Sequence, residues 1–330
     1  MKATYNLNGL ITVEVDGPRP YIRYFENEYR RMSFPADMDG EFRQMPHVRL
    51  KIVDDMMHLP VRKMRFKNLL HFTYAISDLE TACPTLHFQR HWLDRAYFTP
   101  LGAFIQGQLL EPLMYLKLLE ANVLFMHAAG VAKGGNAYVF PAHGGTGKTT
   151  MSLDLVKRGF ELMGDDLLMV DAQRGVVHSF ARPLHLFTYN LRSLDVPLHL
   201  WLIIRAKDGL RLLLQIVTGQ KFLISTRVHV DEIMDISFAD SASLEQLTFL
   251  KREGESEILS FDNPAHREMA IKLIVQSADL NESLFQNIVE NDAIKAWEID
   301  VVRNVLSHVN KMQVINARQA DRATIARNLV

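Results

Sequence analysis

A glycine-rich segment at residues 142–150, with the sequence AHGGTGKTT, constrains the fold of this chain more than any other feature. Glycines let backbone N–H groups converge on phosphate oxygens, which side chains at the same positions would block. The segment matches the Walker pattern of nucleotide-binding loops except at its first position, where Ala142 replaces glycine and limits backbone freedom at the loop entrance. We therefore expect a strand before the loop, a helix after it, and a bound triphosphate.

The loop residues predict a division of roles around that triphosphate. Lys148 would bring a mobile positive charge to the β- and γ-phosphates, and the Thr149 hydroxyl would ligate Mg²⁺. The following helix would direct its positive end at the anion. The expected cofactors are therefore ATP and Mg²⁺. The predicted nucleotide-binding residues are Gly144, Gly145, Thr146, Gly147, Lys148, Thr149 and Thr150.

The segments on either side of the loop predict a partly antiparallel sheet. Residues 123–133 have strand-like sequence, 134–136 (GGN) form a turn signal, and 137–140 form a second strand that runs into the loop. In most doubly wound nucleotide-binding folds the strand before the loop is parallel to its neighbours and follows a helical crossover. A hairpin entry favours a different sheet. After the loop, residues 149–158 predict a helix that ends at Gly159.

Two adjacent acids, Asp165 and Asp166, interrupt the next predicted strand, at residues 160–170. They would point to opposite faces of the strand, or one would lie at a local distortion. Because their neighbours are apolar, burying both charges without a metal or a partner would be costly. One acid can organise Mg²⁺, and the other can accept a proton from an attacking hydroxyl. The residues alone do not say which acid does which.

His127 lies on the first strand of the predicted hairpin, in an apolar run. Such a histidine is by default a packed core residue. Here the hairpin lies beside the strand that enters the loop, which brings His127 toward the phosphates and favours a functional role. Arg182, further along the chain, either holds a phosphate or the substrate or is an ordinary surface arginine.

The order and spacing of these residues resemble the catalytic domain of HPr kinase/phosphorylase and the broader group of HPr-kinase-like proteins. The resemblance rests on residues 126–130 (MHAAG), on the glycine loop, and on residues 157–166 (KRGFELMGDD), and it covers about residues 121–185. The nucleotide-binding core of that family is similar to that of phosphoenolpyruvate carboxykinase. The predicted fold is accordingly α/β (α+β), with a P-loop kinase core of this type around a mixed, partly antiparallel sheet.

The resemblance also implies a role for each site residue. Lys148 and Thr149 would bind phosphate and Mg²⁺, and Asp165 would support the metal. Asp166 would be the catalytic base, and His127 would assist near the transferred phosphate. The predicted catalytic residues are thus His127, Lys148 and Asp166, and the predicted metal ligands are Thr149 and Asp165.

Two departures from the family narrow the expected function. Residues 182–185 (RPLH) and the apolar and amide residues after them replace a Glu-Arg-Gly-type sequence that holds a metal-binding glutamate in the HPr enzymes, which argues against the reverse, dephosphorylating activity. The first 120 residues do not resemble the regulatory domain of that family, which argues against HPr as the substrate. The acceptor hydroxyl would then belong to a serine of another peptide or protein, or to a small molecule.

Strand-like and helical patterns divide the chain into two predicted domains. Residues 1–120 would form a smaller N-terminal α+β lobe that takes part in substrate recognition, and residues 121–330 the catalytic domain with C-terminal helices. Helices are predicted at residues 101–121, 264–275, 281–291 and 295–309. The predicted function is an ATP-dependent kinase that phosphorylates a hydroxyl. The alternative is a P-loop ATPase or a nucleotide-dependent switch that acts by binding a partner.

Composition limits the remaining partners. The formal net charge is −1, so we expect no general attraction to nucleic acid or anionic lipid. The most apolar stretch, residues 101–130, is interrupted by charged residues, so no membrane span is expected. With Cys83 as the only cysteine, no intrachain disulfide can form, which is typical of the cytoplasm. The sequence leaves homo-oligomer formation open. Residues 301–330 read as a basic helix that faces either solvent, an acidic partner or a second subunit.

Overall fold

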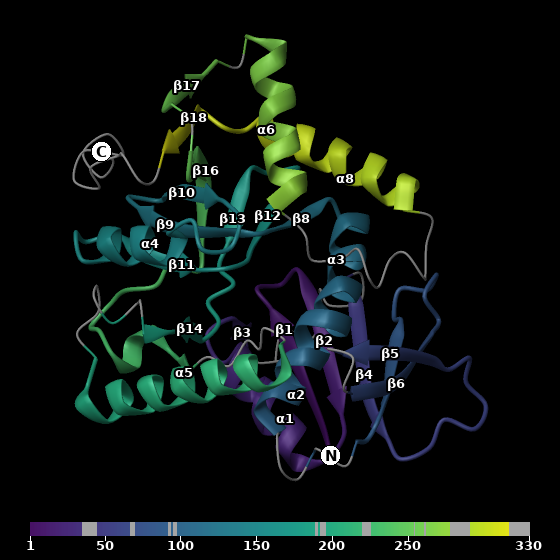
Figure 1. Ribbon diagram of the computed structural model, residues 1–330. Coiled ribbons are helices and arrows are strands. Elements are labelled where there is room, and N and C mark those ends of the chain that lie inside the picture. The colour runs from purple at the N-terminus through teal and green to yellow at the C-terminus, as the bar shows by residue number, and fades with distance from the viewer. Residues whose placement is uncertain are drawn as a thin grey trace.

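The computed structural model of the chain describes residues 1–34, 45–66, 70–91, 94, 98–188, 191, 196–219, 226–253, 255–260, 262–277 and 291–316. These residues form two large mixed sheets with helices packed around them (Figure 1). The mixed α/β organisation predicted from the sequence is confirmed at this level.

The N-terminal sheet has seven strands in the order β3-β1-β2-β4-β7-β6-β5. Its strands are β1 (Lys2–Leu7), β2 (Ile11–Asp16), β3 (Ser33–Phe34), β4 (His47–Val53), β5 (Arg62–Phe66), β6 (Leu70–Ser77) and β7 (Thr85–Gln89). The pairs β2–β4 and β4–β7 are parallel, and the other pairs are antiparallel. Helix α1 (Arg19–Tyr29) buries Phe25 and Tyr29 in the core beside this sheet.

A continuous helical segment links the two sheets. It comprises α2 (Phe98–Ile105), a π-helical turn η3 (Gln106–Leu110) and α3 (Glu111–Glu120). The predicted helix over residues 101–121 is therefore confirmed. Almost every side chain of α3 is buried, including that of Lys117, which donates to Glu120. The Tyr115 hydroxyl on α3 donates to Glu298 on α8 (Asn291–Leu306), which ties the segment to the second sheet.

The second sheet contains the glycine loop, and its main path runs in the order β11-β9-β10-β16-β13-β12-β8. Its strands are β8 (Val123–Met126), β9 (Ala128–Lys133), β10 (Asn136–Pro141), β11 (Glu161–Gly164), β12 (Leu168–Asp171), β13 (Val176–His178), β16 (Ser241–Lys251), β17 (Glu257–Leu259) and β18 (Lys311–Asn316). The β9–β10 pair is an antiparallel hairpin, as predicted, while β10–β16 and β16–β18 are parallel.

Two strands of this sheet are broken where the sequence predicted them to be continuous. The predicted strand over residues 123–133 divides at His127 into β8 and β9, and the one over residues 160–170 divides at residues 165–167 into β11 and β12. β9 pairs with β11, whereas β8 pairs with β12. At each break the chain passes directly from one end of the strand order to the other. His127 lies at the first break, and the Asp pair lies at the second.

Gly130 permits the close approach of the strands near these breaks. A Cβ atom at Gly130 would lie 2.6 Å from Cδ1 of Leu168, so a larger residue there would require the Leu168 side chain to move. A glycine in a strand interior often marks a place where a neighbouring segment approaches closely.

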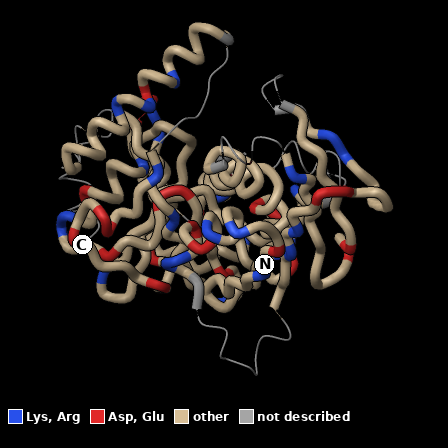
Figure 2. Tube along the Cα trace, turned by 90° about the horizontal axis from the view of Figure 1, so that it is seen from below, with Lys and Arg blue, Asp and Glu red and all other residues tan. Residues whose placement is uncertain are grey.

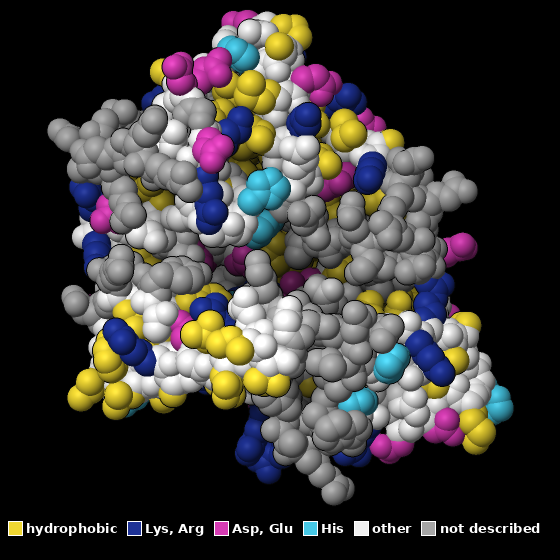
Figure 3. Space-filling view, viewed as in Figure 1, with side chains coloured by type: hydrophobic (Ala, Val, Ile, Leu, Met, Phe, Trp, Pro, Cys, Tyr) yellow, Lys and Arg dark blue, Asp and Glu magenta, His cyan; other side chains and the backbone are white. Residues whose placement is uncertain are grey.

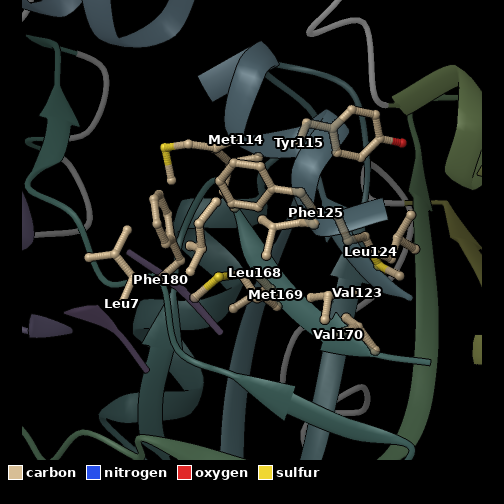
Figure 4. Close-up of a cluster of buried hydrophobic side chains, with 14 of the residues drawn as sticks. Leu7, Met114, Tyr115, Val123, Leu124, Phe125, Leu168, Met169, Val170 and Phe180 are labelled. Atoms are coloured by element: carbon tan, nitrogen blue, oxygen red, sulfur yellow. The ribbon is translucent and has the colours of Figure 1, made fainter. Parts of the chain in front are cut away.

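The second sheet is buried on both faces. α4 (Lys148–Val156) packs on one face together with Val131 and Phe140, whereas α3, α6 (Pro264–Ser277) and α8 cover the other face, where Val139 and Leu247 lie. Side chains of β8 and β12 meet α3 and Leu7 of β1 in one apolar cluster (Figure 4). β8 and β12, the strands next to His127 and the Asp pair, are thereby packed against α3 and against the N-terminal sheet.

Residues 183–240 gave no readable motif in the sequence, yet the described residues of this range include two strands and two helices. These are β14 (Leu184–Leu186), β15 (Thr226–Val228), the long helix α5 (Leu198–Thr218) and the short helix η5 (Val230–Glu232). β14 and β15 pair antiparallel as a separate small sheet. Pro197 and Gly219 flank α5, and Gly219 has a φ of 66°, an arrangement typical of helix ends.

The C-terminal part differs from the sequence prediction in one respect. α6 and α8 match two predicted helices, and the predicted helix over residues 281–291 lies almost entirely outside the described residues. The helical reading of residues 301–330 is wrong for residues 311–316, because this segment forms β18 between β16 and β17. Tertiary pairing with an existing strand has outweighed local helix propensity there.

Charged residues of both signs are interspersed along the trace (Figure 2). Among the described residues, no helix is both long enough and apolar enough to span a bilayer.

Candidate functional site

The glycine loop connects β10 to α4 and presents its backbone to solvent. Gly144, Gly145 and Gly147 are exposed. Gly147 takes a φ of 104° just before the first residue of α4, a left-handed conformation that an L side chain rarely adopts. The free N–H groups of the first helical turn therefore open toward the loop, which is the arrangement that binds anions at helix N-termini.

Lys148 is the first residue of α4 and is only 6% exposed. Its Nζ donates to the carbonyl oxygen of Ala142 at 2.7 Å, a bond that closes the loop on itself. The same ammonium lies 2.7 Å from Nε2 of His127. Burial lowers the pKa of Lys148, while the charges of Asp166 and Asp165 act in the opposite direction. A cation in such a position gains from any further anion that enters the loop.

Asp166 lies on the open side of the site. Its Oδ1 is 2.9 Å from Nε2 of His127 and 4.0 Å from Nζ of Lys148, and its Oδ2 accepts from Arg182 at 3.0 Å. Burial raises the pKa of this carboxyl, but the hydrogen bond from His127 and the charge of Arg182 outweigh it, so the pKa is lowered overall. The side chain is 52% exposed, so a second molecule can reach an ionised carboxylate.

His127 connects Lys148 and Asp166 through a single atom. Its Nε2 contacts both side chains, yet an imidazole nitrogen carries either a hydrogen or a lone pair. It therefore donates to Asp166 or accepts from Lys148, and the two arrangements differ by the position of one proton. His127 can therefore exchange one hydrogen-bond partner for the other when the charge on Lys148 or Asp166 changes.

Asp165 lies on the closed side of the site, among hydroxyl groups. Its Oδ2 accepts from Thr149 at 2.8 Å, and its Oδ1 accepts from Ser152 at 3.3 Å. Burial raises the pKa of Asp165 to about 6, although both hydrogen bonds favour the charged form. Asp165 and Asp166 are adjacent in sequence, yet they contact different partners, because the chain bends between β11 and β12. The prediction that one acid sits at a distortion describes this geometry better than a regular strand.

Arg182 joins the site to the N-terminal half of the chain. Its guanidinium contacts Asp166 through Nη2 and Glu111, at the start of α3, through Nη1. The Glu111 residue is 2% exposed, and its pKa is raised by burial in spite of Arg182. The sequence left open whether Arg182 was a surface residue, and its position between two carboxylates shows that it is not.

Arg252 contacts the loop itself. It follows β16 and donates through Nη2 to the carbonyl oxygen of Gly145 at 2.7 Å. A Cβ atom at Gly145 would lie 2.7 Å from the same nitrogen. Arg252 thus adds a second side-chain cation, besides Lys148, at the glycine loop. No sequence pattern points to Arg252, because it lies 104 positions after Lys148 and no motif surrounds it.

The other predicted residues line the same loop. The Thr146 hydroxyl donates to the carbonyl oxygen of His143 at 2.8 Å, and Thr150 lies in the first turn of α4. Ser152 was not predicted, although its position three residues after Thr149 places both hydroxyls on one face of α4. Helical spacing is the signal that reveals it. In the sequence, Glu111 is only one of the charged residues that interrupt the apolar stretch at residues 101–130.

The donor set near Thr149 fits Mg²⁺ better than a metal held by protein alone. Within the described residues, no three His, Cys, Asp or Glu side chains are grouped to hold an ion. Mg²⁺ commonly binds one or two carboxylates together with phosphate oxygens and waters. Thr149 and Asp165 offer one hydroxyl and one carboxylate beside the anion-binding end of a helix, which matches that mode.

Comparison of the chain with protein-family models and with curated proteins found no match.

Proposed function

We propose that this protein is a kinase of the HPr-kinase-like type, which transfers the γ-phosphate of ATP to a hydroxyl group. Its P-loop core would be the second sheet, with the loop between β10 and α4. The antiparallel β9–β10 hairpin that leads into the loop supports this lineage over a doubly wound ATPase. The domain proposal assigns catalysis to residues 121–330 and acceptor recognition to residues 1–120.

The separation of two adjacent carboxylates is the observation on which the proposal chiefly rests. Asp165 contacts two hydroxyls at the start of α4, whereas Asp166 contacts His127 and Arg182 and is open to solvent. Hydrolysis also needs a group that positions the attacking water, and it is the antiparallel hairpin entry that favours transfer to an acceptor here. A second, accessible carboxylate beside the phosphate site is what a phosphotransferase needs to hold an acceptor.

Each residue has a task in this proposal. The loop N–H groups and Lys148 bind the β- and γ-phosphates, and Thr149 and Asp165 hold Mg²⁺ either directly or through water. When bound, Mg²⁺ neutralises phosphate charge and helps to orient the terminal phosphoryl group. Arg252 donates to the carbonyl oxygen of Gly145. When a nucleotide binds, a phosphate oxygen can replace that carbonyl as its partner.

In the transfer step, a bond forms between the acceptor oxygen and the γ-phosphorus, and the bond from that phosphorus to the bridging oxygen of ADP breaks. The hydroxyl proton passes to the Asp166 carboxylate, and ADP leaves. Asp166 is a weak base, because its pKa is lowered. Its main effect is to orient the hydroxyl, since proton transfer occurs late when the transition state is loose. Catalysis is then mostly positioning and charge neutralisation.

The function is tested with γ-labelled ATP, Mg²⁺ and a cell extract fractionated by size. The wild-type protein should transfer label to one fraction, which identifies the acceptor as protein, peptide or small metabolite. Asp166→Asn, which keeps the shape of the side chain, should transfer label at least about 100-fold more slowly. Steady release of labelled phosphate in the absence of any acceptor, at an equal rate in both proteins, would instead favour an ATPase or switch.

A further inference from the structure

Helix α5 carries its apolar side chains on the outside. Of the large apolar residues that are exposed among the described residues, eight of twelve lie on this one helix. They are Leu198, Leu202, Ile203, Leu210, Leu212, Leu213, Ile216 and Val217, with exposures from 42% to 73%. Figure 3 shows apolar atoms gathered along the lower left edge of the molecule, where α5 lies in Figure 1.

The inner side of α5 combines polar contacts with apolar packing of Leu200 and Ile204. Asp208 is buried, accepts from the backbone N–H of Thr188 at 2.7 Å, and pairs with Arg211 at 3.2 Å. Arg211 also lies over the ring of Phe187. Ile204 is the fully buried apolar residue of this side. Asp208 and Arg211 are thus paired on the inner side, and the large apolar side chains on the outer side are left exposed to a partner.

Six residues define what we call the α5 strip. They are Leu198, Leu202, Ala206, Gly209, Leu213 and Val217, and all are exposed. At about 100° per residue they fall within an arc of roughly 100° on the helix. Read in either direction, the strip has the same order of two large, two small and two large residues. Successive members are four residues apart, except that Ala206 and Gly209 are three apart. Its midpoint lies between Lys207 and Asp208.

This symmetry points to one occupant. In a two-fold symmetric contact, residue i of one copy meets residue j of the other, and j meets i. An antiparallel pair of α5 helices centred on the strip places Ala206 against Gly209, so that the backbones approach closely, and Leu202 against Leu213. A bilayer or an unrelated protein imposes no such relation between the two halves of a helix.

The size of the face fits the same occupant. The strip holds four of the eight large exposed side chains, and the other four flank it. At roughly 100 Å² of surface for each of the eight, the strip and its flanks together approach the ~800 Å² that each partner buries in a stable interface. Among the residues of α5, Arg205 carries the charge nearest to the strip, and its guanidinium lies 4.4 Å from the ring centroid of Trp201. We infer that the protein forms a homodimer through antiparallel packing of α5 on α5 of a second copy.

Gly209→Glu is the sharpest single test. A Cβ atom at Gly209 meets nothing within 4 Å, so the isolated chain tolerates the change, and loss of a helical glycine favours the helix. In the dimer the new carboxylate is buried against Ala206 of the other copy, close to the two-fold axis and therefore near its own symmetry mate. Light scattering across a concentration series should give the mass of two chains for the wild type and a dimer weakened by at least about 100-fold for the variant.

Ile258→Glu is the matched control, because Ile258 is 82% exposed on β17, away from α5. Its dimer affinity should equal that of the wild type. A wild-type protein that remains monomeric at all concentrations, or an equal loss in both variants, would overturn the inference.

A charge exchange tests the antiparallel register. Leu202→Lys and Leu213→Glu should each weaken the dimer alone, whereas the double variant should recover affinity, because each lysine then meets a glutamate of the other copy. If the double variant is weaker than both single variants, the register is wrong. If monomeric wild type binds vesicles of phosphatidylglycerol and phosphatidylcholine and Leu213→Glu does not, the strip is a lipid-binding face and the inference fails.

Discussion

The two sides of the site differ although they start from neighbouring residues. On the closed side, Asp165 is surrounded by the hydroxyls of Thr149 and Ser152, and burial raises its pKa to about 6. On the open side, Asp166 meets His127 and Arg182, and its pKa is lowered. Identical carboxyl groups thus acquire opposite properties from their surroundings.

The difference arises from the bend between β11 and β12. In a regular strand, two adjacent side chains would face opposite sides of the sheet, and each would lie beside the residues of the neighbouring strands on its own face. The break turns one acid toward α4 and the other toward the residues that follow β13. In the proposed function, one short segment thereby provides one carboxylate for the metal and another for the acceptor. Each substitution below affects the closed side, the open side or Lys148, which lies near both.

Removing the shared cation should have the largest effect. In Lys148→Met, the loop loses the ammonium that lies near both Asp166 and the phosphate site, and phosphoryl transfer should fall on the order of 10³-fold. Lys157→Met, a lysine at the exposed end of the same helix, should change little. Initial rates of transfer from labelled ATP provide the measurement. Comparable rates in the two variants would contradict a role of Lys148 on either side.

The open side should be the more fragile one structurally. Arg182→Met leaves Glu111 buried without its cation, which should lower the free energy of unfolding by about 3 kcal/mol. The double variant Arg182→Met/Glu111→Leu removes both charges and should recover most of the loss. Urea unfolding measures both. A double variant no more stable than the single one would show that Arg182 acts on stability through other contacts.

The closed side should respond to pH near 6. Because the pKa of Asp165 is raised to about 6, this carboxyl is protonated at lower pH and cannot ligate Mg²⁺. Mg²⁺-dependent nucleotide affinity should therefore fall as the pH is lowered through 6, by up to about tenfold per pH unit. Calorimetric titration with Mg²⁺ and ATP at several pH values measures it. The same pH profile in Asp165→Asn would assign the effect to another group.

The smallest effect should come from one hydroxyl on the closed side. Thr149→Val removes the donor to Asp165, and Mg²⁺-dependent nucleotide affinity should fall by roughly three- to tenfold, as expected for one hydrogen bond. Thr149→Ser keeps the hydroxyl and should restore the affinity. Thr150→Val is the neighbouring control. If Thr149→Ser binds as weakly as Thr149→Val, packing rather than the hydroxyl explains the loss.

The sequence predicted those parts of the fold that local signals determine. Gly134 and Gly135 marked the hairpin turn, and Gly159, with a φ of 84°, marked the end of the helix after the loop. The partly antiparallel sheet followed from these positions. The break at His127 was not predicted, because the flanking residues are apolar and the change of strand partner gives no local signal. A distortion at the Asp pair was one of two alternatives, and the structure has the break there.

The candidate site was predictable where its residues are close in sequence. His127, the loop and the Asp pair lie within 40 residues of each other and are brought together. Arg252 and Glu111 come from distant elements without a motif, so topology alone places them. α5 was not predicted because apolar residues occur on both its buried and its exposed sides and leave no single apolar stripe in the sequence, although Pro197 and Gly219 mark its ends.

The division of tasks between the two acids is tested most directly by measuring Mg²⁺-dependent ATP binding and phosphoryl transfer in Asp165→Asn and Asp166→Asn side by side. Asp166→Asn should bind ATP with Mg²⁺ as the wild type does and lose transfer by at least about 100-fold. Asp165→Asn should lose the Mg²⁺ dependence of binding. Normal transfer by Asp166→Asn, or equal losses of binding in both variants, would contradict the separation of a metal side from an acceptor side.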